Sequence, residues 1–190
     1  FDRARVDLLA PALEAAMAEE LAEIDAIASN PEPATFENTI VALERAGRSL
    51  DRASTIYGIY SSSLSTPEFQ AVERKMAPRL AAHADRIAQN AALFRRIEAV
   101  YESPEKGQLT PEQQRLAWQR HTDFVLAGAR LGPAEKQRVA AINQQRAAET
   151  LSSIIASDEI GRFADQNAAE TMQRMPGLAL YRDQGEGRFI

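Results

Sequence analysis

Apolar residues recur at steps of three and four along the chain from its N-terminus to about residue 155 of 190. That spacing puts them on one side of a helix and predicts one amphipathic helix after another. The first predicted helix has Pro11 in its first turn and ends near Ser29, because the prolines of Asn30-Pro31-Glu32-Pro33 disfavour helical backbone before them. Its apolar stripe consists of Leu13, Met17, Leu21, Ile24 and Ile27.

The segment 35–64 predicts a long second helix. Thr35 is a suitable N-cap, and apolar or small residues follow at helical spacing as far as Leu64. About thirty residues of helix would extend roughly 45 Å. Gly47 and Ser54 fall within the stripe and predict close approach of a neighbouring helix. The serine run 61–65 ends the helix.

Capping signals mark the later helices. Thr66-Pro67 and Asn90 each start one, and Thr110-Pro111-Glu112-Gln113 has the pattern of a capping box. Residues 103–109 are predicted as a loop, Pro78 should kink the helix that contains it, and Gly132-Pro133 separates the last two helices. We therefore predict a mainly α fold: an antiparallel bundle of about six helices with a short helix-plus-strand C-terminal tail.

The periodicity lapses after Ile142, since no large apolar residue follows until Leu151. We place a boundary between residues 143 and 158, with a helical region at 1–150 and a different unit at 151–190. The second unit should hold a short helix over about 165–175 and two short strands around the Gly-rich turn of LALYRDQGEGRFI.

Composition excludes several classes of protein. The absence of cysteine excludes disulfides, Cys-based zinc sites, iron–sulfur clusters and a cysteine nucleophile. A net charge of −5 without a basic block gives no support for nucleic-acid binding. No apolar run is long enough for a transmembrane helix, and the N-terminus lacks the features of a signal peptide, so a cytoplasmic location is expected.

The residues themselves predict no catalytic, cofactor-binding or metal site. His83 and His121 lie near apolar helix faces outside any zinc-binding motif, and each is followed two residues later by an aspartate that a helix would turn to another face. The 61–65 run lacks a nucleophile-elbow pattern, and Trp118 is expected in the core. Three charged pairs are expected on solvated faces: Glu44-Arg45, Glu73-Arg74 and Arg95-Arg96.

Several blocks of residues 1–150 resemble the thimet oligopeptidase family of zinc metallopeptidases, and the peptidyl-dipeptidase and oligopeptidase A branch looks closest. The most specific are Pro33-x-Thr35-Phe36-Glu37-Asn38-Thr39 and His121-x-Asp123-Phe124-Val125-x-Ala127-Gly128-Ala129-x-Leu131. MAPRLAAHADRI at 76–87 and AEKQRVAAIN at 134–143 occur in the matching order.

This resemblance implies an all-α wall of a deep channel in which short peptides are hydrolysed. In the family, the two histidines of an HExxH helix and a further glutamate hold zinc, and the HExxH glutamate is the general base. No HExxH occurs in the 190 residues. The implied role is therefore that of the non-catalytic N-terminal part, inactive alone and without a cofactor of its own. Its partners would be the missing catalytic portion and, in the full-length parent only, zinc and short peptides.

Residues from about 153 to 190 resemble the start of the plug domain of TonB-dependent outer-membrane receptors. The features are Ile160-Gly161, Asp165-x-Asn167-x-Ala169-Glu170, Arg174-Met175-Pro176-Gly177 and Arg182-Asp183-x-Gly185-Glu186-Gly187-Arg188. Two alternatives stay open. One is a catalytically empty helical interaction module that kept the peptidase family's N-terminal scaffold. The other is a fragment fused to a receptor plug segment, with a periplasmic or outer-membrane location. Apolar surface exposed by a missing partner would favour self-association.

Overall fold

The computed structural model describes residues 5–160, 181–183 and 186–189, and its contacts divide the chain into units 1–147 and 148–190. The described part is mainly helical, as the sequence predicts. Its elements in chain order are α1 (Val6–Ala28), the π-helix η1 (Phe36–Val41), α2 (Ala42–Arg45), α3 (Arg48–Ser63), α4 (Pro67–Ala88), α5 (Ala91–Glu102), the 3-10 helix η2 (Pro104–Gln108), α6 (Pro111–Leu126), α7 (Pro133–Ile160), β1 (Tyr181–Asp183) and β2 (Glu186–Phe189).

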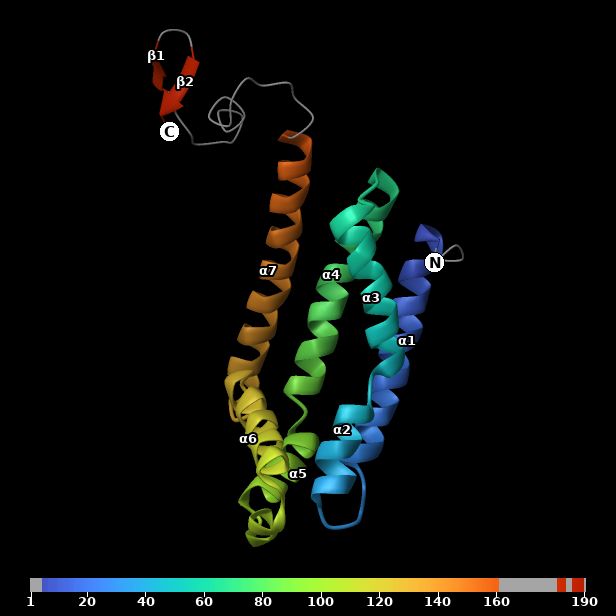
Figure 1. Cartoon of the computed structure of the whole chain (residues 1–190), viewed down its shortest axis with the longest axis vertical. Coiled ribbons are helices and arrows are strands. Elements are labelled where there is room, and N and C mark those ends of the chain that lie inside the picture. Colours follow the sequence, from blue (N-terminus) through green and yellow to red (C-terminus); the bar gives the residue numbers. More distant parts are fainter. Residues whose placement is uncertain (1–4, 161–180, 184–185, 190) are drawn as a thin grey trace. The chain divides into compact units, whose positions relative to one another are not determined.

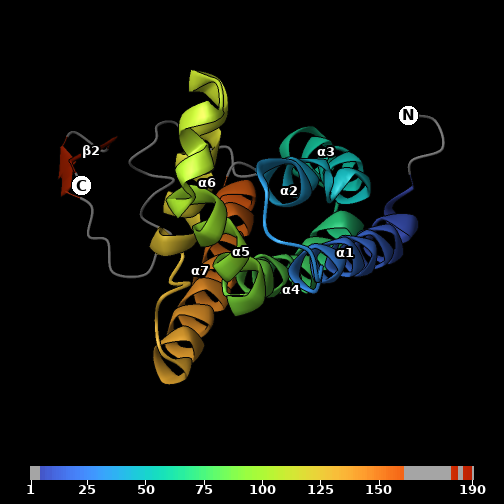
Figure 2. The same cartoon turned by 90° about the horizontal axis from the view of Figure 1, so that it is seen from below.

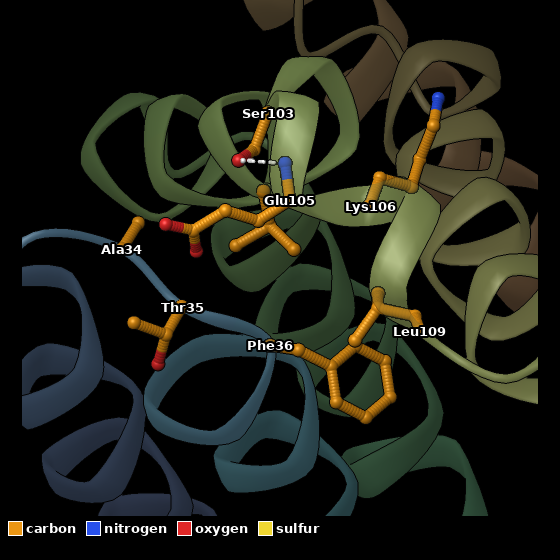
Figure 3. Close-up of a pocket in the computed structure, with 8 residues that line it drawn as sticks. Ala34, Thr35, Phe36, Ser103, Glu105, Lys106 and Leu109 are labelled. Atoms are coloured by element: carbon orange, nitrogen blue, oxygen red, sulfur yellow. Dashed lines mark hydrogen bonds between the residues drawn. The ribbon is translucent and has the colours of Figure 1, made fainter.

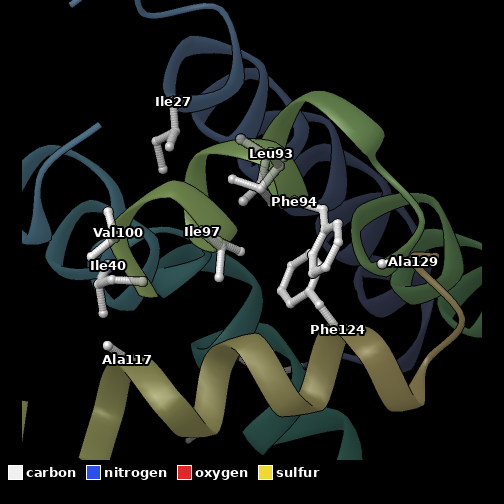
Figure 4. Packing of buried hydrophobic residues seen from close by; sticks show 10 residues of the cluster. Ile27, Ile40, Leu93, Phe94, Ile97, Val100, Ala117, Phe124 and Ala129 are labelled. Carbon is white, nitrogen blue, oxygen red and sulfur yellow. The ribbon is translucent and has the colours of Figure 1, made fainter. Parts of the chain in front are cut away.

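Two apolar clusters hold the first unit together. In one, α1 packs against α3 and α4, which run beside it in alternating directions (Figure 1). Its buried members are Ala10, Leu13, Met17 and Met76. The other joins the end of α1 to η1, α5 and α6, and Figure 4 shows its side chains converging from these elements. Its buried members are Ile24, Ile27, Ile40, Leu93, Phe94, Ile97, Val100, Ala117, Phe124 and Ala129.

The long helix predicted over 35–64 is wrong, because the chain breaks at Gly47. η1 and α2 end there, and α3 begins at Arg48 in a new direction (Figures 1 and 2). Gly47 has φ +77°, a left-handed conformation that glycine adopts readily. Its N–H donates to Glu23 Oε2 of α1 at 2.8 Å, and a Cβ on this residue would overlap the Glu20 carboxylate. The close approach predicted at Gly47 exists, but it occurs at a break between helices.

The prediction for Pro11 is wrong in its position. α1 starts at Val6, so Pro11 lies within the helix and beyond its first turn. Because proline has no backbone N–H, the carbonyl of Asp7, four residues earlier, lacks its usual helical donor.

The capping predictions are confirmed for α4, α5 and α6. The hydroxyl of Thr66 accepts the N–H of Phe69, the side chain of Asn90 accepts two N–H groups, and Thr110 and Gln113 form the predicted capping box. The predicted loop at 103–109 contains one short 3-10 helix, η2, instead of irregular chain throughout.

The helix α7 runs without interruption from Pro133 to Ile160, through the predicted boundary at 143–158. Loss of the apolar stripe therefore does not end the helix. Further along, β1 and β2 form the predicted antiparallel pair, with Arg182 opposite Gly187 and Asp183 opposite Glu186. The helix predicted at 165–175 lies outside the described residues. None of the described helices is long and apolar enough to cross a bilayer.

Candidate functional site

A small hollow of about 40 Å³ lies between the entry to η1 and the region of η2 (Figure 3). It is lined by Ala34, Thr35, Phe36, Val100, Ser103, Glu105, Lys106 and Leu109. Both hydroxyls on its wall are already used as caps: Thr35 Oγ1 accepts the N–H of Asn38, and Ser103 Oγ accepts the N–H of Glu105. No histidine lines the hollow, so neither hydroxyl belongs to a pair of the Ser–His kind that activates a nucleophile.

His83 of α4 is buried and pairs with a carboxylate of α1. Its Nε2 lies 2.5 Å from Glu20 Oε2, directly beside the Gly47 break. Two shallow grooves flank this pair, and His83 lines both. One is lined by Glu14, Met17, Ala18, Leu21, Arg79, Ala82, His83 and Arg86, and the other by Glu20, Leu50, Leu80, His83, Ala84, Ile87, Ala88 and Phe124. The pair links α1 to α4, and its glutamate also lies against Gly47. Within the described residues, no further acidic or histidine side chain completes a metal site around it.

His121 of α6 lies in an aromatic stack. Its ring stacks on Tyr101 of α5 with centroids 4.3 Å apart and on Phe94 at 5.7 Å. Burial, and then the positive charge of Arg130, lower the pKa of His121 below its ordinary value, against the opposing effect of Glu98. The ring of His121 is thus engaged in packing against the aromatic side chains of α5.

One of the charged residues predicted on a solvated face, Glu73, is instead buried. Glu73 is 3% exposed and accepts the hydroxyl of Ser61 at 2.5 Å. Its charge adds to burial, the larger effect, in raising the pKa of Tyr57 to about 12. Glu44 is exposed, as predicted, and pairs with Arg120 of α6, whose pKa is raised chiefly by this hydrogen bond.

Arg96 is a further correction. Its Nη1 donates to the carbonyls of Asn30 and Glu32, both at 2.8 Å, and its Nη2 donates to Asn38 Oδ1 at 2.9 Å. Simple periodicity places Arg96 at the edge of the apolar stripe of α5, and nothing in that pattern signals three acceptors from a distant loop.

The predicted end of the helix in the serine run is confirmed, since α3 stops at Ser63.

Trp118 contradicts its predicted core position, because 51% of this residue is exposed. The buried side of α6 belongs to Ala117 and Phe124, which point into the cluster in Figure 4. The size and apolarity of the indole predicted its burial. Successive residues of a helix lie about 100° apart around its axis, so Trp118 faces away from the side on which its neighbour Ala117 is buried.

The motif residues that carry the family resemblance hold turns. Asn38 Oδ1 accepts the N–H of Thr35 and the hydroxyl of Thr39, and it also accepts from Arg96, so the TFENT block fixes the entry to η1. At the end of α6, Gly128 has φ +93°. The N–H of Gly128 donates to the carbonyl of Val125, and the N–H of Ala129 donates to the carbonyl of Phe124. These two bonds form a Schellman cap.

Comparison with known proteins gives two relatives of the same name. Dipeptidyl carboxypeptidase of Escherichia coli (strain K12) is 35% identical over 150 residues, 79% of this chain and 22% of the relative. Dipeptidyl carboxypeptidase of Salmonella typhimurium (strain LT2) is 32% identical over 173 residues, 88% of this chain and 25% of the relative. This chain resembles the dipeptidyl carboxypeptidases. No family model matches it.

The resemblance to peptidyl-dipeptidases is thus confirmed, and the chain spans about a quarter of the length of the curated relatives it matches. Neither dipeptidyl carboxypeptidase supports the plug-domain resemblance of residues 153–190. Wherever it begins, a match to 88% of the chain includes residues on both sides of the predicted 143–158 boundary.

The described residues do not fit a zinc site of the kind the family implies. Among them, no group of three histidine, aspartate or glutamate side chains is placed to hold a metal. His83 and His121 each lie near a single glutamate, at 2.5 Å and 3.9 Å.

Proposed function

We propose that this chain is the non-catalytic, N-terminal helical part of a metallopeptidase of the dipeptidyl carboxypeptidase type. It forms a wall of the channel in which short peptides bind, and zinc and the hydrolytic residues belong to the catalytic portion. The observation that carries the proposal is the 35% identity to the E. coli relative over 150 residues. Wherever it begins, a match of that length includes residues 41–150, and so most of the helical unit.

The geometry supports a scaffolding role. The motif residues fix the entry to η1 and the end of α6, and the histidines are engaged in packing or in a pair with one carboxylate. A unit built in this way presents a shaped surface to a peptide and leaves bond cleavage to residues elsewhere. Only the assembled enzyme would release dipeptides from a peptide substrate.

The test is a chimera in which the matched segment of the E. coli dipeptidyl carboxypeptidase is replaced by the corresponding residues of this chain. We expect the chimera to release dipeptides from a short peptide, and the 190-residue chain alone to release none with or without added zinc. A matched control chimera carries Leu93→Asp, which disrupts the core of the unit. Zinc-dependent hydrolysis by the chain alone, or a folded chimera without activity, would contradict the proposal.

A further inference from the structure

Within the described part of the chain, the outward side of α6 exposes two large apolar side chains. Trp118, the only tryptophan of the chain, is 51% exposed, and Leu126 is 80% exposed. Of the seven large apolar residues exposed in the described part of the chain, four lie between residues 118 and 142. These four are Trp118, Leu126, Leu131 and Ile142.

Helix geometry puts the first two on one face. At about 100° per residue, Leu126 lies roughly 80° around the axis from Trp118 and about 12 Å along it. Ala117 and Phe124 lie on the other side, where Figure 4 shows them in the core cluster. Between Trp118 and Leu126 on the outward side come Arg115 and Thr122. We call these four residues the outer face of α6.

The composition of the outer face is that of a protein interface. Tryptophan and arginine are enriched at the centres of protein–protein contacts, and lysine and glutamate are depleted there. This face has one arginine and no acidic residue among its four members. A membrane or a nucleic acid would be expected to select several cations instead of one.

The matched region indicates what covers this face. The match to the E. coli relative includes α6 wherever it begins, yet it accounts for 22% of that protein. In the relative, this helix is therefore part of a chain with more than three quarters of its polypeptide outside the match. Resting on the proposed function, we propose that the outer face of α6 is the surface on which the catalytic portion docks. The peptide-facing side of the wall is then formed by other elements.

The test compares the same double substitution in two settings. Trp118→Ser with Leu126→Ser removes two side chains that are exposed in the chain alone, so its thermal midpoint should not fall. In the chimera described above, the same change should lower the midpoint of the assembled protein by about 3 °C or more. Ile59→Ser with Leu64→Ser, a pair of exposed apolar residues outside the outer face, is the matched control and should change neither protein.

The outcomes separate this inference from the proposed function. An equal midpoint for the parent and the Trp118/Leu126 chimera would overturn the docking face even if both chimeras are active. A stable but inactive parent chimera would contradict the channel-wall function, and its midpoint would still test the face. Trp118 is the only tryptophan, so tryptophan fluorescence reports on this face alone. A blue shift of the emission as the concentration of the chain rises, together with the mass of a dimer, would assign the face to a second copy. That result would overturn our proposal.

Discussion

In the cluster that joins the end of α1 to η1, α5 and α6, ten buried residues form one continuous apolar interior, and the rings of Phe94 and Phe124 lie 6.4 Å apart. Where α1 packs against α3 and α4, the cluster has four buried residues, and α3 contributes none. The other buried positions of this region are mixed: Phe69 is packed against Tyr57 and Tyr60, whereas Glu73 is buried against Ser61 and His83 against Glu20.

The difference shows two ways of holding helices together. Burial of apolar area is nondirectional and tolerates small shifts, whereas a buried polar group stabilises only while its partner stays in place. We therefore expect the α5–α6 region to supply most of the stability and the α1–α3–α4 region to depend on specific pairs and on the Gly47 break.

The largest expected effect comes from truncating one leucine in each cluster. Leu93 and Leu13 are both 0% exposed, so they make a matched pair. Leu93→Ala should lower the free energy of unfolding by about 4–5 kcal/mol, because the ten-residue cluster cannot collapse around the cavity. Leu13→Ala should cost about 2–3 kcal/mol, since its smaller cluster can relax. Urea denaturation followed by circular dichroism measures both, and equal losses would contradict the comparison.

An intermediate effect is expected at the glycine that breaks the second helix. Gly47→Ala places a Cβ in a left-handed conformation and against Glu20, so it should destabilise the fold by about 1–3 kcal/mol. Gly58→Ala is the matched control, because Gly58 lies inside α3 with open space around it. That change should be neutral or stabilise by up to about 1 kcal/mol. A harmless Gly47→Ala would show that the break is not specified by this residue.

The contrast between these two glycines also explains how far the sequence could be interpreted. Period and caps predicted the helix starts at Thr66, Asn90 and Thr110, because those signals act within one turn of the chain. The break at Gly47 could not be predicted from its own segment. Its N–H is satisfied by Glu23, and its missing side chain leaves room for Glu20, both more than twenty residues away.

The predictions for two charged residues were wrong for a related reason. Glu73 and Arg96 resemble surface charges in a local pattern, and only the tertiary fold brings Ser61 to one and the 30–38 loop to the other. Trp118 was predicted in the core because a large apolar residue is usually buried. It is 51% exposed, since Ala117 and Phe124 occupy the buried side of α6.

The smallest expected effect is the pH dependence of stability that His121 gives to the α5–α6 region. The pKa of His121 is lowered, chiefly by burial in the aromatic stack and then by Arg130. The unfolded chain therefore binds this proton at a higher pH than the folded chain does, near 6.5. Stability from the neutral imidazole is present above that pH and is lost as the pH falls through it toward the lower folded value.

His121→Phe keeps a ring between Tyr101 and Phe94 and removes the titration. We expect the variant to lose less stability than the parent chain between pH 7 and pH 5, as measured by urea denaturation at each pH. Arg130→Gln should raise the pKa of His121, measured by NMR, without restoring its ordinary value, because burial is the larger cause. A pKa of His121 above 6.5 in the parent chain would mean that the stack does not exclude water, and the α5–α6 region would then resemble the polar packing around His83.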